Sequence, residues 1–282
     1  MTGVAAWHVV NGAPWEGDDT FVSKVRQGSQ RLTPLMSKWE QCPPVTLEHL
    51  MALQNSLDMN DTFDSAVWVV ALICFWACCR LGELTVDSVN LFDPQRHVSR
   101  SASFHFRNNV QGDKVIESLH LHLPWTKSTR EEGADLAASA HAPLSPADAF
   151  RNHLRVNVGA PPGGHLFAFR TPSGTYTPMV KEWFLARCHE IWSTFGLLLP
   201  SGHSFRIGGA TELLLAGVPP EVVAAIGHWK SLAFLLYWRK IEEILPRAVS
   251  KSYVKSRIAE VSKEFERFRV THRIPAVITL PQ

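Results

Sequence analysis

The longest unbroken apolar run of the chain extends from Ala66 to Cys79 and predicts a buried helix. With 14 residues it is too short to cross a bilayer, and it shows no polar face. Asp61 or Thr62 can open this helix, because both residue types cap helix N-termini. We expect the helix to run on through Arg80, which would place a guanidinium at the end of an otherwise buried element.

The pattern changes to alternation between residues 97 and 123, which predicts strands. Asn108 to Asp113 contains a glycine and is interpreted as the turn of a hairpin. Lys127 stands just past the last predicted strand. Three leucines face one side of this strand and two histidines the other, namely Leu119, Leu121 and Leu123 against His120 and His122. The histidines lack a third ligand, so the sequence predicts no metal site.

Several amphipathic helices surround these segments in the sequence. Thr46 begins one that runs through Leu57, and Ser145-Pro146 begins another that leads to Arg155. After a short strand at His165 to Phe169, Thr177-Pro178 opens a third helix, which Gly196 closes. The apolar face of this third helix consists of Val180, Phe184, Cys188, Ile191, Trp192 and Phe195.

The stretch from Gly202 to Tyr237 predicts three short helices in succession. Ser204 can cap the first, which ends at Gly217. Pro219-Pro220 starts the second, which ends at Gly227, and Ser231 can cap the third, which carries Tyr237. These elements together predict a mainly α fold with a small antiparallel β-sheet, in the α+β class.

Length and charge bound the organisation of the chain. Its 282 residues suffice for a large core, whereas residues 1 to 40 hold only the end of a helix near Val10 and a basic helix from Phe21 to Leu32. Pro43-Pro44 marks a boundary, so 41–282 is expected to be the main domain. The net charge is only +2, but residues 230–282 contain eleven Lys/Arg against five Asp/Glu. This basic segment suits either a polyanion or a solvated helix face.

The five cysteines form no CxxC pair, and three of them fall in or beside the apolar run. This usage favours reduced, buried thiols in an intracellular protein over a disulfide framework or a zinc site. The N-terminus also lacks the basic and apolar regions of a signal peptide. The cysteines are Cys42, Cys74, Cys78, Cys79 and Cys188.

Candidate chemistry gathers between residues 203 and 237. His203 and Arg206 are three apart and therefore share a helix face, where they can hold an anion. His228 follows at a helix junction, and Tyr237 comes nine residues later. The same residues have simpler interpretations: a His-x-x-Arg pattern arises by chance, a tyrosine among apolar residues is usually core, and two helices joined by a glycine turn can form a DNA-binding helix-turn-helix.

The ordered set of these residues resembles the tyrosine recombinases, the phage integrase family of DNA breaking-rejoining enzymes. The family pattern is Arg, Lys, His-x-x-Arg, His or Trp, and Tyr, with the last His or Trp nine residues before the tyrosine. The sequence motifs C-R-L-G-E-L and H-S-F-R-I-G-G-A-T are most similar to those of recombinases from fungal Crypton-type elements. The resemblance covers roughly residues 41 to 250, and the matching positions are Arg80, Lys127, His203, Arg206, His228 and Tyr237.

The resemblance implies the catalytic domain of a metal-independent DNA strand transferase that needs no cofactor. Arg80 and Arg206 would clamp the phosphate oxygens of the scissile linkage, and His228 would add a donor. Tyr237 would be the nucleophile, activated either by His203 as the acceptor of its proton or by the cationic clamp, which would favour its ionised form. Lys127 is the expected general acid for the 5′-oxygen; its distance of 47 residues from Arg80 is long, and Lys114 is the alternative.

The resemblance also implies partners and location. The partner is double-stranded DNA, bound by a homo-oligomer, a tetramer in this family, in which the segment after Tyr237 docks on a neighbouring subunit. The protein would be intracellular, and nuclear in a eukaryote. Residues 1–40 would be the remnant of an N-terminal helical DNA-clamping domain, and 41–282 the catalytic domain with a basic helical tail. Glu83 is expected to be accessory, and the DNA-binding residues are expected to be Arg130, Lys230, Arg239 and Lys240.

The chain departs from the family pattern at its N-terminus, and two other functions stay open. Because the clamping domain is short, we expect weak and salt-sensitive DNA binding. A domesticated DNA-binding protein without turnover would need the basic surface but no nucleophile at this spacing. A topoisomerase would use the same chemistry to relax DNA without strand exchange. The complete set of six residues favours the recombinase.

Overall fold

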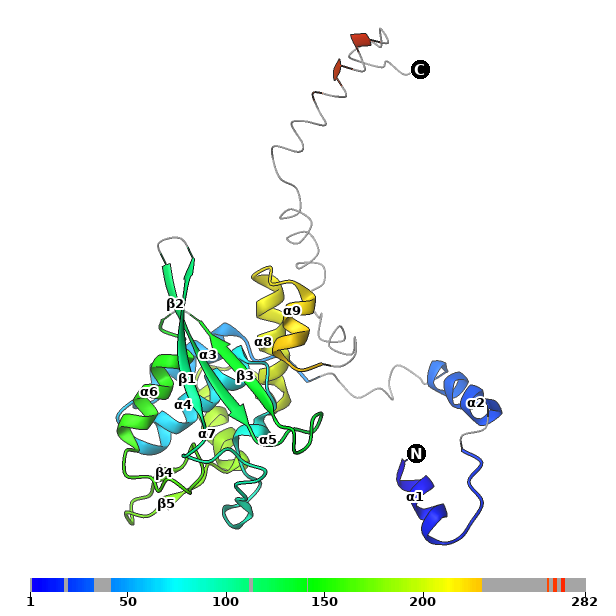
Figure 1. Ribbon diagram of the computed structural model, residues 1–282, viewed down its shortest axis with the longest axis horizontal. Coiled ribbons are helices and arrows are strands. Elements are labelled where there is room, and N and C mark those ends of the chain that lie inside the picture. The colour runs from blue at the N-terminus through cyan, green and yellow to red at the C-terminus, as the bar shows by residue number, and fades with distance from the viewer. Residues whose placement is uncertain are drawn as a thin grey trace. The chain divides into compact units, whose positions relative to one another are not determined.

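The computed structural model describes residues 2–17, 20–32, 42–111, 114–140 and 142–229, together with 263, 266–267 and 270–271. It separates into two compact units, Met1–Gln41 and Cys42–Gln282. The first unit contains α1 (Thr2–Val10) and α2 (Thr20–Arg31), close to the helices predicted there (Figure 1). Val9 and Val10 are exposed, so these residues build little core of their own.

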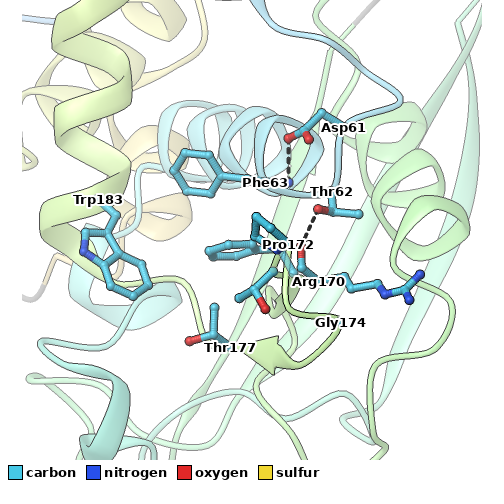
Figure 2. A pocket seen from close by; sticks show the side chains of 10 residues that line it. Asp61, Thr62, Phe63, Arg170, Pro172, Gly174, Thr177 and Trp183 are labelled. Atoms are coloured by element: carbon cyan, nitrogen blue, oxygen red, sulfur yellow. Dashed lines mark hydrogen bonds between the residues drawn. The ribbon is translucent and has the colours of Figure 1, made fainter.

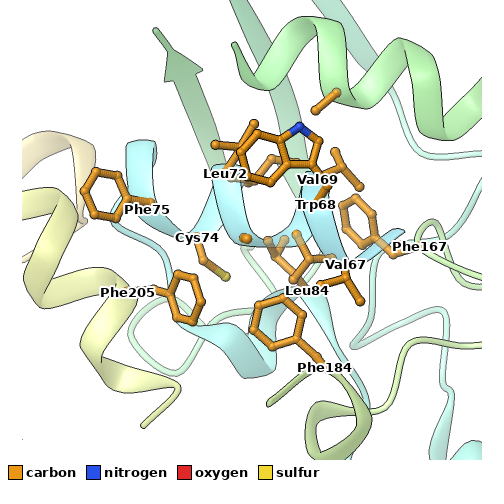
Figure 3. Packing of buried hydrophobic residues seen from close by; sticks show 14 of the residues in the cluster. Val67, Trp68, Val69, Leu72, Cys74, Phe75, Leu84, Phe167, Phe184 and Phe205 are labelled. Atoms are coloured by element: carbon orange, nitrogen blue, oxygen red, sulfur yellow. The ribbon is translucent and has the colours of Figure 1, made fainter. Parts of the chain in front are cut away.

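Helix α4 (Thr62–Trp76) is the centre of the second unit. Asp61 caps it, because its carboxylate accepts hydrogen bonds from the backbone N–H groups of Phe63 (2.9 Å) and Asp64 (2.8 Å). All residues from Asp64 to Phe75 are buried, as the continuous apolar run predicts. Figure 3 shows aromatic and aliphatic side chains packed around this helix. The helices that pack against it are α3 (Leu47–Ser56), α6 (Pro146–Val156), α7 (Lys181–Thr194) and α8 (His203–Leu215).

The prediction that α4 runs through Arg80 is wrong. The helix ends at Trp76, and Cys78 adopts a left-handed backbone with φ 47°. Arg80 instead precedes α5 (Leu81–Leu84), a short helix that starts in a new direction. The carbonyl of Cys78 accepts a hydrogen bond from the Arg206 side chain at 2.7 Å, so a contact with α8 replaces continuation of the helix.

A three-stranded antiparallel sheet covers α4 and α6 on one side. Its strands are β1 (Phe104–Gln111), β2 (Lys114–Leu123) and β3 (Ala134–Ser139), in the order β1-β2-β3. The three leucines of β2 are buried, as the alternation predicts. The predicted turn is too long, because Asn108 pairs with Glu117 and the strand reaches Gln111. Strand β3 was not predicted, since its sequence is rich in alanine and pairing with β2 determines it.

Caps explain most of the other helix boundaries. Thr46 caps α3 and Ser145 caps α6, both as predicted. Helix α7 begins at Lys181 and not at Thr177, because Thr177 pairs with Phe169 in the small hairpin of β4 (Phe169–Arg170) and β5 (Tyr176–Thr177). The predicted strand at His165 to Phe169 is thus mostly a turn. Phe195 is exposed, whereas the rest of the predicted apolar face of this helix is buried.

Two more boundaries concern the segment that carries His203. Helix α8 starts at His203, so Ser204 lies inside the helix instead of capping it. Gly217 follows its end with φ 82°, and α9 (Pro220–Ile226) comes next, as predicted. The predicted third helix, with Ser231, lies outside the described residues. In Figure 1, α8 and α9 stand beside the sheet on the side of β3.

Two adjacent glycines bring α8 unusually close to its neighbours. A Cβ atom at Gly208 would lie 1.9 Å from the Val45 carbonyl oxygen, and one at Gly209 would lie 1.8 Å from the Phe75 carbonyl oxygen. No side chain fits at such distances, so backbone packs directly on backbone here. The contact fixes α8, which carries two candidate site residues, against the end of α4.

Four of the five cysteines are buried, and none of the five forms a disulfide. Burial raises the pKa of Cys78 to about 12, so this thiol is neutral at physiological pH. The expectation of buried thiols is wrong for Cys42, which is exposed. Only Cys74 lies within α4, because the helix ends before the next two cysteines. Within the described part of the chain, no helix has the length and apolar character needed to span a membrane.

Candidate active site

Several of the predicted site residues line one cavity of about 770 Å³. Its walls come from the segment that starts α5, the loop between β2 and β3, the first turns of α7 and the residues that lead into α8. These segments are far apart in the sequence, and the packing around α4 brings them together. The lining residues are Arg80, Leu81, Gly82, Glu83, Trp125, Lys127, Arg130, Lys181, Leu185, Ser201, Gly202 and His203.

Arg80 is held at this cavity by Glu83, the partner that the sequence suggests. Its Nη1 donates to the Glu83 carboxylate at 2.8 Å, and its backbone N–H donates to the other carboxylate oxygen at 2.8 Å. Its Nη2 donates to the Ser128 hydroxyl at 3.3 Å. The Arg80 side chain is still 33% exposed, so an anion can reach it from solvent.

Lys127 lies on a tight loop that Thr126 organises. The Thr126 hydroxyl accepts hydrogen bonds from the backbone N–H groups of Ser128 (3.3 Å) and Thr129 (3.1 Å). Thr126 and Arg130 also exchange two backbone hydrogen bonds, which close the loop. Thr126 is buried, whereas the Lys127 side chain is exposed toward the cavity. The loop therefore presents Lys127 one residue away from the hydroxyl that contacts Arg80.

Arg206 lies behind the cavity and is almost fully buried, with 2% of its surface exposed. Its Nη1 donates to the Cys78 carbonyl (2.7 Å), its Nη2 donates to the Gly227 carbonyl (2.8 Å), and the Trp229 ring covers it at 4.1 Å. Burial, and after it the positive charge of Arg80, lower the pKa of the Arg206 guanidinium. Arg206 thus fastens three segments together and adds a second positive charge near Arg80.

The two predicted histidines take different positions. His203 is the first residue of α8, is exposed and lines the cavity. His228 has a left-handed backbone with φ 52°, and its Nε2 lies 3.0 Å from the carbonyl oxygen of Asp135 in β3. His228 is not among the lining residues, although the adjacent Gly227 is bonded to Arg206.

The structure therefore brings together Arg80, Glu83, Lys127, Arg130 and His203; Arg206 does not line the cavity but lies close enough to Arg80 for their charges to interact. The predicted nucleophile Tyr237 lies outside the described residues. The predicted DNA-binding residues Lys230, Arg239 and Lys240 also lie outside them. The alternative general acid, Lys114, begins β2 and its side chain is not described.

Three residues of this region were not anticipated from the sequence. Ser128 accepts a hydrogen bond from Arg80, and Trp125 contacts two guanidinium groups, with Arg96 at 5.2 Å and Arg130 at 5.8 Å from its ring centre. Lys181 reaches the cavity from the start of α7. Trp125 lies two residues before Lys127, which is a usable signal, whereas no motif points to Lys181.

A second cavity, of about 810 Å³, lies between the start of α4, the β4–β5 hairpin and α7. Figure 2 shows Phe63 and Trp183 on its walls, with Arg170 at its edge. Arg170 is the single cation among its ten lining residues, and none of the predicted site residues lies there. Its apolar walls do not suit a phosphate group.

The histidines of the sheet make contacts of their own. His120 stacks on His105 with ring centres 4.8 Å apart, and His122 pairs with the Asp135 carboxylate at 2.7 Å. Burial, followed by the neighbouring charges of His105 and Arg107, lowers the pKa of His120. Among the residues that the structure describes, no three His, Cys, Asp or Glu side chains are grouped to hold a metal ion.

No protein-family model and no curated protein matches this chain. Among solved structures, the chain is similar to the XerH site-specific recombinase in a post-cleavage complex with its difH substrate, at 13% identity and a TM-score of 0.46, covering 80% of this chain and 54% of that one. For the Tn1549 transposon integrase bound to circular-intermediate DNA, the identity is 17%, the TM-score 0.46 and the coverage 83% and 71%.

A third similar structure is the Flp recombinase in a Holliday junction complex, at 15% identity and a TM-score of 0.39. That match covers 78% of this chain and 53% of the Flp chain. The chain thus spans about half the length of the XerH and Flp chains.

Proposed function

We propose that this chain breaks and rejoins DNA strands through a covalent phosphotyrosine, as the tyrosine recombinases do. The observation that carries the proposal is the meeting of Arg80, Lys127 and His203 at one cavity with Arg206 behind it. The buried Arg206 guanidinium lies near the positive charge of the Arg80 guanidinium, and this arrangement is costly without an anion. A phosphodiester supplies the matching charge and accepts hydrogen bonds from both.

The proposed reaction begins with attack by the Tyr237 phenol oxygen on the phosphorus atom of one DNA strand. The phenol proton passes to His203, and the bond between phosphorus and the 5′-oxygen breaks. Lys127 donates a proton to the departing 5′-oxygen, which leaves as a hydroxyl group. The products are a 3′-phosphotyrosine and a free 5′-hydroxyl, and attack by a second 5′-hydroxyl reverses the steps.

The cationic groups stabilise the charge that develops on the non-bridging oxygens in the transition state. Arg80 contributes from the exposed wall, where Glu83 and Ser128 hold its orientation. Arg206 has five N–H groups, and those not bonded to the Cys78 and Gly227 carbonyls are assigned to the phosphate. His228 is assigned a further hydrogen bond to the same oxygens, which requires it to leave the Asp135 carbonyl.

The choice of Lys127 over Lys114 as general acid rests on its place in the molecule. Lys127 lines the same cavity as Arg80, and the Thr126 loop connects the two through Ser128. Lys114 begins β2 at the far end of the hairpin, where β1 ends. We assign double-stranded DNA as the substrate, a tetramer as the assembly, 1–40 as a remnant clamping domain and 41–282 as the catalytic domain, in a nuclear protein if the host is a eukaryote.

The test is the formation of a covalent adduct with nicked suicide DNA, from which the cleaved strand cannot return. Wild type is expected to give a protein–DNA band that survives denaturation, and Tyr237→Phe is expected to give none. Tyr253→Phe is the matched control and should keep the band. An adduct that persists in Tyr237→Phe would overturn the proposal, and a bandshift without any adduct would indicate a DNA-binding protein without turnover.

Relaxation of supercoiled plasmid separates the recombinase from a topoisomerase. A recombinase is expected to convert paired target sites into exchanged products, whereas a topoisomerase relaxes the plasmid and exchanges nothing. Both activities should disappear together in Tyr237→Phe, because they share the covalent intermediate.

A further inference from the structure

Two ammonium groups approach the candidate site from different walls of the same cavity. Lys127 comes from the loop between β2 and β3, and Lys181 is the first residue of α7. Both side chains are exposed. The family pattern accounts for one lysine, so the second one requires an explanation of its own.

The backbone fixes the position of Lys181 relative to Arg80. The N–H of Lys181 donates to the Val86 carbonyl at 2.9 Å, and the N–H of Val86 donates to the Met179 carbonyl at 3.0 Å. These bonds join the start of α7 to the segment that directly follows α5, whose first turn is adjacent to Arg80. Val86 and Met179 are buried, so the Lys181 backbone lies on a rigid part of the wall.

Local helix energetics do not favour a lysine at this position. The N-terminus of a helix carries partial positive charge, which disfavours a cation in the first turn and favours a carboxylate such as Glu182. Among the described residues, no ion pair joins the Lys181 ammonium to a carboxylate. A residue placed against a local rule often serves a site, and here the site is a cavity that already contains Arg80, Arg130 and His203.

We infer that Lys181 binds the DNA backbone at the phosphate next to the scissile one, while Lys127 alone donates the proton. This inference rests on the proposed function and extends it to a positioning residue outside the family pattern. The Lys127 loop is bonded to Arg80 through Ser128, which places Lys127 beside the clamped phosphate. Lys181 lies, with Leu185, on the wall that α7 contributes to the cavity, and from there it would contact the DNA strand.

A substrate with sulfur in place of the bridging 5′-oxygen separates the two lysines. A thiolate leaves without a proton, so it removes the need for a general acid but not the need for backbone binding. With the oxygen substrate, Lys127→Ala is expected to slow adduct formation by about 10²–10⁴-fold, and the sulfur substrate should restore most of this loss. Lys181→Ala should slow both substrates equally, by about tenfold, and Lys181→Arg should keep most of the rate because it keeps the charge.

Equilibrium binding to intact duplex gives a second readout that does not depend on cleavage. Lys181→Ala should reduce the slope of log affinity against log salt concentration by about 0.9, as expected for one lost phosphate contact. Arg170→Ala, which removes an exposed cation at the other cavity, is the control and should leave the slope unchanged.

Each outcome decides one of the two proposals. An unchanged salt slope and an unchanged rate in Lys181→Ala would overturn the role of Lys181 while the proposed function stands. Recovery of Lys181→Ala, but not of Lys127→Ala, on the sulfur substrate would exchange the roles of the two lysines. If wild type forms no adduct with either substrate, the proposed chemistry fails, and the salt slope still tests whether Lys181 binds DNA.

Discussion

The charged side chains at the start of α4 are arranged differently from those just beyond its end. At its start, the buried Asp64 carboxylate receives two hydrogen bonds of 2.9 Å from Arg187, and this pairing raises the pKa of Arg187. Beyond its end, Arg80 and Arg206 lie near each other, and the pKa of Arg206 is lowered by burial and by Arg80. The charges at the first end are paired within the chain, whereas at the second end two arginines face one carboxylate, Glu83, and this excess of positive charge suits the proposed binding of an anion.

The largest expected effect comes from removing a charge beyond the end of α4, where positive charge exceeds negative charge. Arg80→Ala should slow adduct formation by about 10²–10³-fold, because a donor to the developing charge is lost. Its free energy of unfolding should fall less than in Asp64→Ala, because the Arg80 side chain is one-third exposed and Glu83 keeps the hydrogen bond from the backbone N–H of residue 80. Single-turnover cleavage and urea denaturation measure the two quantities. A fall in stability as large as that from removing Asp64 would mean that the two ends do not differ.

Removing a charge at the start of α4 should have the opposite effects, a loss of stability with little change in the rate of adduct formation. Asp64→Ala leaves Arg187 without its buried partner and should lower the free energy of unfolding by about 2–3 kcal/mol, somewhat less than for a fully buried pair because Arg187 is partly exposed. The adduct rate of the folded fraction should stay near that of wild type. Asp148→Ala, which removes an exposed carboxylate 3.7 Å from Arg151, is the control and should change stability by less than about 0.5 kcal/mol.

Acid should weaken the fold at a place that belongs to neither end. Burial lowers the pKa of His153 to about 4 and that of His165 to about 3. Below about pH 6.5, the ordinary pKa of histidine, these two histidines bind protons in the unfolded chain but stay neutral in the folded chain. Stability should therefore be highest above pH 6.5 and fall as pH drops toward 4, by about 1.4 kcal/mol per pH unit for each histidine.

The variant His165→Phe tests this source of acid sensitivity. His165 lies between the rings of Phe92 and Phe167, so a phenyl group suits its surroundings. Urea denaturation at pH 7 and pH 5 should show a smaller loss in the variant than in wild type. An unchanged pH dependence would place the acid-sensitive group elsewhere.

The smallest expected effect is stabilisation by a simple anion. Sulfate at about ten times its dissociation constant should stabilise wild type by about 1.4 kcal/mol if it binds between Arg80 and Arg206. This corresponds to a rise of about 3–5 °C in melting temperature, measured at constant ionic strength. Arg80→Ala should lose the rise, and Asp64→Ala should keep it. An equal rise in both variants would indicate general salt effects and not a site.

Much of the fold follows from local signals in the sequence. Thr46, Asp61 and Ser145 cap helices where they were expected to, and the alternation of β2 gives the correct buried face. The end of α4 could not be predicted, because the apolar run continues past it and contains no glycine or proline. The helix ends at Trp76, and just beyond it the Cys78 carbonyl accepts a hydrogen bond from Arg206, a tertiary contact that no local signal announces.

The candidate site was predictable only as an ordered set of residue types. The order and spacing singled out Arg80, Lys127 and His203, and these three do line one cavity. No local signal indicates that Arg206 is buried and bonded to two carbonyls, because its partners lie 128 and 21 residues away. Lys181 was also unpredictable, since only the packing of α7 beside α5 brings it to the cavity.

The glycine contact between α8 and α4 acts as a spacer for the two arginines. Gly209 rests on the Phe75 carbonyl, Arg206 is three residues earlier on the same helix, and Arg80 is five residues beyond Phe75. The separation of the two guanidinium-bearing backbones is therefore determined by main-chain atoms in direct contact, which rotamer changes cannot alter. A substitution that enlarges either glycine would change the distance between the two arginines of the proposed phosphate site, even where every charged residue is retained.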